Sequence, residues 1–106
     1  MNGVNRVFIL GTLGADPKPM TSREGKTYTS LSLATNRKWK DKNGDKAEKT
    51  DWHRITVWGR LAQICQEHLK KGQKVAVEGH LSTFDTDDNG AKKRHTVINA
   101  DEVTFV

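Results

Sequence analysis

Residues 52–72, WHRITVWGRLAQICQEHLKKG, decide the fold, because they place an alternating strand directly before a short amphipathic helix. Side chains on a strand alternate between its two faces. In residues 52–58 one face therefore carries Trp52, Arg54, Thr56 and Trp58, and the other carries His53, Ile55 and Val57. Because Ile55 and Val57 already supply a face for the core, the tryptophans are expected to lie on the solvent side.

The helix is predicted over residues 61–71. Its apolar residues recur at helical spacing, at Leu61, Ile64, Cys65 and Leu69. Lys70 and Lys71 fall in the expected last turn, where cations favour a helix terminus, and Gly72 is a stop signal. Cys65 lies on the apolar stripe and is predicted to be a packing residue.

Four further strands are predicted around this unit, over residues 4–13, 27–35, 73–81 and 95–106. Asp16-Pro17 is expected to break the chain, Asn43-Gly44 to centre a long hairpin or loop tip, and Asn89-Gly90 to form a turn between the last two strands. The order is three strands, a helix and two strands. It predicts an all-β fold, a five-stranded Greek-key OB-fold barrel with one short α-helix between strands 3 and 4. At 106 residues, the chain is expected to form a single domain over residues 1–106.

Charge favours a polyanionic partner. Eighteen Lys and Arg residues against 13 Asp and Glu residues give a net charge of +5. Residues 36–60 alone hold eight basic and four acidic residues. A solvated, lysine-rich loop would explain the same charge pattern. The residues next to these cations must therefore distinguish a polyanion-binding surface from a solvated loop.

Several other functions are not supported. One cysteine allows neither an internal disulfide nor a cysteine-rich zinc site, and residues 1–8 lack the pattern of a signal peptide, so a cytoplasmic location is expected. No apolar run approaches the length of a membrane span. The four histidines lack paired metal-ligand spacing, no phosphate-binding glycine loop is present, and Asp87-Asp88 is interpreted as a polar turn. We therefore predict no enzyme activity, no metal and no cofactor.

Tryptophans and cations are interleaved at two places. Trp39 lies within Arg37-Lys38-Trp39-Lys40, and Trp52 and Trp58 lie beside Arg54 and Arg60. Unpaired bases stack on aromatic faces while cations hold the phosphates between them, so this pattern is typical of single-stranded nucleic-acid binding. The alternative is that the tryptophans belong to the core of a small barrel. Trp39, in a stretch expected to be a polar loop, fits that alternative least.

The sequence also resembles the DNA-binding domain of the bacterial single-stranded DNA-binding proteins over essentially its whole length. The resemblance rests on GVNRVFILGTLGADP, on LSLAT, and above all on DWHRITVWGRLA. It implies an OB fold, a homotetramer, and sequence-independent binding of single-stranded DNA in replication, recombination and repair, hence a place at the nucleoid. Base-stacking aromatics would be Trp39, Trp52 and Trp58.

The resemblance assigns further roles to individual residues. Phosphate contacts would come from Arg37, Arg54, Arg60 and Lys71, to which the basic stretch adds Lys40. His53 would lie at a subunit contact. Relatives carry a basic, Trp-containing segment after the fourth strand, whereas LSTFDTDDNG is acidic here, so Phe84 is the expected substitute. The family's acidic tail, which recruits replication and repair proteins, is not part of these residues, so such partners are expected only with a tail.

Two other classes of protein fit the sequence less well. An OB-fold adaptor of replication restart, acting mainly through protein contacts, would not need the three tryptophans. A nuclease would need a metal-ligand cluster, which the sequence does not offer.

Overall fold

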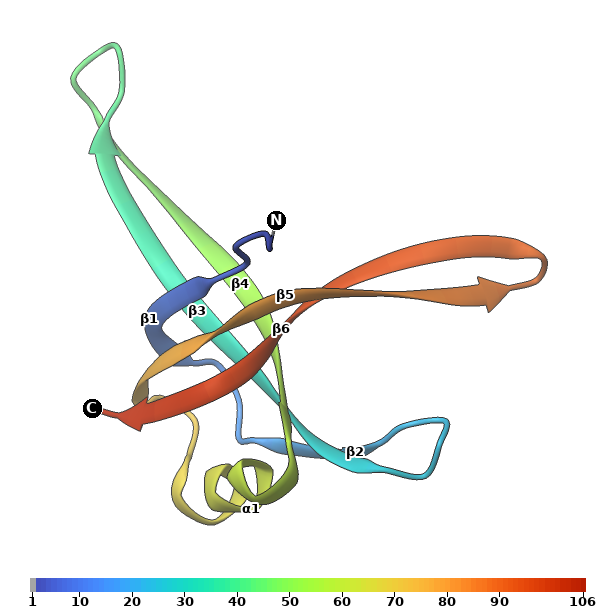
Figure 1. Cartoon of the computed structure of the whole chain (residues 1–106). Coiled ribbons are helices and arrows are strands. Elements are labelled where there is room, and N and C mark those ends of the chain that lie inside the picture. The colour runs from blue at the N-terminus through green and yellow to red at the C-terminus, as the bar shows by residue number, and fades with distance from the viewer. Residues whose placement is uncertain (1) are drawn as a thin grey trace.

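The computed structural model describes residues 2–106. In chain order its elements are β1 (Val7–Leu13), β2 (Lys18–Thr21), β3 (Thr27–Lys40), β4 (Lys46–Trp58), α1 (Gly59–His68), β5 (Lys74–Asp88) and β6 (Ala91–Phe105). Figure 1 shows α1 at one end of the barrel and two long hairpins that extend away from it.

Five of the strands close into a barrel. They are hydrogen-bonded in the order β1-β5-β6-β4-β3, and β1 pairs with β3 to complete the ring. Pairing is antiparallel except between β4 and β6, where Ile55 lies opposite Ile98 in parallel. The helix connects β4 to β5, the third and fourth strands of the barrel, so the predicted OB fold is confirmed.

The core lies inside the barrel and is built by the alternating strands and one face of α1. Its members are Ile9, Leu13, Leu31, Leu33, Ile55, Val57, Ala62, Cys65, Leu69, Val75, Val77 and Ile98. Ile55 and Val57 are fully buried while Trp52 and Trp58 are exposed, as the alternation predicted. Burial also raises the pKa of the Cys65 thiol to about 11, which keeps it protonated and supports its role as a packing residue.

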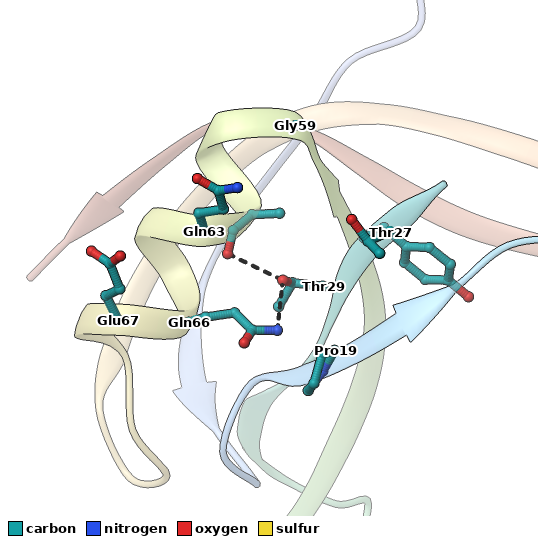
Figure 2. A pocket seen from close by; sticks show the side chains of 9 residues that line it. Pro19, Thr27, Thr29, Gly59, Gln63, Gln66 and Glu67 are labelled. Carbon is teal, nitrogen blue, oxygen red and sulfur yellow. Dashed lines mark hydrogen bonds between the residues drawn. The ribbon is translucent and has the colours of Figure 1, made fainter. Parts of the chain in front are cut away.

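A buried hydroxyl attaches α1 to the barrel. Thr29 donates a hydrogen bond to the backbone oxygen of Ala62 (3.1 Å) and accepts one from Gln66 (3.2 Å), as Figure 2 shows. The cleft beside these bonds has a volume of about 410 Å³ and is lined in part by Pro19, Gln63 and Glu67. Its lining includes none of the residues predicted to bind DNA.

The two hairpins extend as two-stranded arms beyond the barrel (Figure 1). The β3–β4 register is continuous from Tyr28 opposite Trp58 to Lys40 opposite Lys46. The expectation that Trp39 lies in a loop is therefore wrong, because it lies on β3 opposite Ala47. Both faces of such an arm contact water, so no apolar alternation distinguishes it from a loop.

The second arm extends β5 and β6 as far as the predicted turn. Residues 83–93, expected to separate the strands, are paired up to Asp88 opposite Ala91. Asn89 and Gly90 have φ values of 52° and 83°, which a two-residue hairpin turn requires.

Two other boundaries differ from the prediction. After the predicted break at Asp16-Pro17, β2 forms a short strand that pairs only with β3, and an edge strand of this kind tolerates Pro19. The helix ends at His68, and extended backbone at Leu69 places Lys70 and Lys71 in the following turn rather than in the last helical turn. Within residues 2–106 no helix is long and apolar enough to cross a membrane.

Candidate nucleic-acid interface

A cavity of about 500 Å³ opens on the outer side of the barrel. Its walls come from the β2–β3 turn, from β4 and from the β5–β6 arm. It brings together three of the sequence-predicted residues, Arg54, Trp58 and Phe84. Arg54 and Trp58 share β4, whereas Phe84 comes from β5 about 26 positions later, so barrel closure brings Phe84 to the cavity.

Trp58 is both exposed and held in place. Its ring lies beside that of Tyr28, its cross-strand neighbour, with centroids 4.6 Å apart and planes tilted by 36°. Its indole N–H donates to Asn99 Oδ1 at 3.4 Å, a long hydrogen bond. With 41% of the residue still accessible, an oriented aromatic face is offered to the cavity.

Trp52 lies on the same face of β4, is 61% exposed, and depends on a glycine for its position. A Cβ placed on Gly14 would clash with Cζ3 of the Trp52 ring and lie 2.7 Å from its Cη2. The backbone at Gly14 is fixed by a hydrogen bond from its N–H to the Ser32 oxygen (2.9 Å). Since side chains do not approach this closely, Gly14 must lack one for the ring to lie where it does.

Gly14→Ala is therefore expected to displace the Trp52 ring and to weaken single-strand binding. The expected loss is at most that of Trp52→Ala, about 1–3 kcal/mol. Titration with labelled oligo(dT) measures it. In a chain that already carries Trp52→Ala, Gly14→Ala should cost nothing more. An equal loss in both backgrounds would contradict this role for Gly14.

Trp39 lies apart from the cavity, on the β3–β4 arm. Arg37 places its guanidinium 5.8 Å from the centre of the Trp39 ring, within cation–π range. Lys40 and Lys46 line a surface hollow beside the same ring. By register, Trp39 and Trp52 point to opposite faces of the β3–β4 ribbon. Trp39 therefore lies near cations but on a different face from Trp52 and Trp58.

Two arginines line the cavity, and one of them had not been predicted. Arg54 comes from β4, between Trp52 and Trp58. Arg23, from the β2–β3 turn, lines the same cavity. Arg23 also lines a hollow directly beside Trp58. No sequence pattern marked Arg23, because only the fold of the turn places it near the tryptophan.

The other predicted cations are dispersed. Arg37 lies 3.3 Å from Asp51, which offsets part of its charge, and Lys40 accompanies Trp39. Arg60 is exposed at the start of α1. Lys71 lies in the turn after α1, where its backbone N–H donates to Asp16 (2.8 Å). None of these four lines the cavity.

The histidines each have their own surroundings. Three lie within hydrogen-bond distance of one side chain: His53 at 2.8 Å from Thr35, His80 at 3.0 Å from Asp101, and His95 at 2.9 Å from Thr86. His53 lies opposite Leu33 on β3, outside the cavity. In residues 2–106 no three His, Cys, Asp or Glu side chains form a group that could hold a metal ion.

The family model, the curated relative and the solved structures described below all point to one family. Residues 4–106 match the model of the single-strand binding protein family. A curated relative, the single-stranded DNA-binding protein 1 of Chlorobaculum tepidum, is 45% identical over 98 residues, which cover 91% of this chain and 60% of that protein. The chain thus spans about three fifths of that relative's length.

Two solved structures share the fold. The Plasmodium falciparum SSB in complex with ssDNA matches with a TM-score of 0.87 and 30% identity, covering 100% of this chain and 97% of the other. A deletion mutant of the single-stranded DNA binding protein from Thermus aquaticus matches with a TM-score of 0.83 and 32% identity, over 98% of this chain and 51% of the other.

Proposed function

This chain belongs to the single-strand binding protein family, and on that premise we propose that it binds single-stranded DNA irrespective of base sequence. Unpaired bases stack on Trp39, Trp52 and Trp58, and arginine and lysine side chains hold the phosphates. The observation that supports this most is the cavity in which an exposed, oriented Trp58 lies with Arg54 and Arg23.

The chemistry favours single strands over duplexes. Every base has a flat π-face, so stacking tolerates any sequence, but in a duplex those faces are already stacked on one another. In the proposed site the cations contact the repeating sugar-phosphate backbone, which is the same for every sequence. The protein therefore acts by binding and protecting DNA rather than by catalysis, in replication, recombination and repair at the nucleoid in the cytoplasm.

The proposal predicts a strong preference that one titration can test. Oligo(dT) should quench the tryptophan fluorescence, while a duplex of equal length should bind far more weakly. Because cations that bind phosphates release counterions, the logarithm of affinity should fall with the logarithm of salt concentration by about 0.7 per phosphate contact. Equal affinity for duplex and single strand would contradict the proposed function.

An adaptor that acts only through protein contacts is less consistent with this surface. Exposed tryptophans beside arginines are costly in a structural strand, and Ile55 and Val57 already provide its core face. An adaptor would bind oligo(dT) and the duplex equally poorly in the same titration.

We further propose that the chain assembles as a homotetramer. Phe8 and Leu10 point outward from β1 and are 71% and 55% exposed, an apolar surface that a second copy would cover. His53 is proposed to contribute to a subunit contact. Native mass measurement at micromolar concentration should give four times the 11.9 kDa chain, and Phe8→Asp should lower that mass. A wild-type sample containing only the monomer would contradict the assembly.

A further inference from the structure

Two aromatic rings face each other across the β5–β6 arm. Phe84 on β5 lies directly opposite His95 on β6. Their centroids are 5.0 Å apart and their planes differ by only 20°, so the rings are stacked. Paired residues on one face of a hairpin commonly stabilise it, but one member of this pair, Phe84, also lines the cavity that Trp58 and Arg54 share.

The two rings have different surroundings. Phe84 lines the cavity and is 43% exposed, whereas His95 is less exposed and does not line it. His95 Nε2 lies 2.9 Å from the hydroxyl of Thr86, which restrains the orientation of the imidazole. His95 therefore supports Phe84 from behind and leaves it accessible from the cavity.

The arm offers little else to a nucleic acid. Between Ser82 and Thr96 it carries three acidic residues, Asp85, Asp87 and Asp88, and three basic residues, Lys92, Lys93 and Arg94, so its formal charge is balanced. Arg94 is further engaged by Asp85 at 3.3 Å. A balanced arm gives no net attraction to phosphates, so the ring pair, which a base can stack on, is the arm's most distinctive feature for contact with DNA.

We propose that Phe84 and His95 form a two-ring platform for a DNA base, in which the base stacks on Phe84 and His95 is the positioning residue. The inference rests on the proposed single-strand binding. On an arm of two solvated strands a lone phenylalanine would sample several rotamers and lose that freedom on binding. The stacked His95 ring restricts the rotamers of Phe84 already in the free protein, so less side-chain conformational entropy is lost when a base binds.

The test is a double-mutant cycle read by the affinity for oligo(dT). Phe84→Ala should weaken binding about 5- to 150-fold, the loss of one stacked base. His95→Ala should weaken it about 2- to 12-fold, the range for an aromatic pair, and His95→Phe should restore it. In the Phe84→Ala background, His95→Ala should have no further effect, since it acts through that ring.

Salt dependence and a matched variant separate this role from the alternatives. The salt slope should be the same for His95→Ala as for the parent, whereas a lost phosphate contact would reduce it by about 0.7. Thr96→Ala alters the next residue of β6, which points to the other face, and should leave affinity unchanged. Additive losses in the cycle, a changed slope, or an equal loss with Thr96→Ala would overturn the platform. If Phe84→Ala has no effect while Trp58→Ala weakens binding, the platform is wrong and the proposed function stands.

Discussion

Replacing Trp52 and Trp58 together with alanine is expected to weaken oligo(dT) binding by about 2–6 kcal/mol. Each stacked base contributes about 1–3 kcal/mol in single-strand binding proteins, the class to which this chain belongs. The residues are six positions apart on β4, roughly 20 Å at the rise of a strand, so their effects should add. Neither ring is part of the core, because Ile55 and Val57 fill it from the opposite face.

Anisotropy of a labelled oligo(dT) measures this loss without relying on the tryptophans that are removed. Trp58→Phe keeps an aromatic face and should retain most of the affinity. Val4→Ala removes apolar surface that is 88% exposed and outside the cavity, so it should leave binding unchanged. An intact fold with undiminished affinity in the double variant would disprove the stacking assignment.

Ile55→Ala is expected to lower the free energy of unfolding by about 2–5 kcal/mol. Ile55 is fully buried where β4 pairs both with Leu31 of β3 and with Ile98 of β6, so a cavity there would weaken two strand contacts at once. A loss of this size is a large fraction of the stability of a small domain.

Urea unfolding at one protein concentration for all variants gives the difference, because assembly makes the apparent stability depend on concentration. Ile55→Val, which removes a single methyl group, should cost about 0.5–1.5 kcal/mol. A loss below 1 kcal/mol for Ile55→Ala would show that the barrel does not depend on this crossing point.

Sequence patterns predicted the barrel, but they left residues 36–51 open between a long hairpin and a loop tip and did not predict that the β5–β6 pairing reaches its turn. Apolar Ile55 and Val57 alternate with polar and aromatic residues because one face of their strand forms the core, and that contrast is visible in the sequence although Thr56 between them is also buried. Residues 36–51 lack it, since both faces of the β3–β4 arm contact water, so Trp39 was expected in a loop. The short β2 strand was missed because it directly follows the break predicted at Asp16-Pro17 and contains Pro19, which only an edge position accommodates.

Only the part of the site that lies on a single strand could be predicted, because a local pattern is all that the sequence shows. Trp52, Arg54 and Trp58 share one strand, so their common face follows from a period of two. Gly14 and Arg23 join them through barrel closure and a turn, neither of which leaves a local pattern. His95 was missed because its stacking on Phe84 depends on the cross-strand register of the arm.

The central claim is that exposed aromatic rings bind bases rather than the DNA backbone. The most direct measurement compares the affinity of oligo(dT) with that of an abasic oligonucleotide of the same length, at one salt concentration, for the parent chain and for the Trp52→Ala, Trp58→Ala double variant. The account predicts that the parent strongly prefers oligo(dT) and that the double variant loses most of that preference. A preference of equal size in both proteins would contradict it.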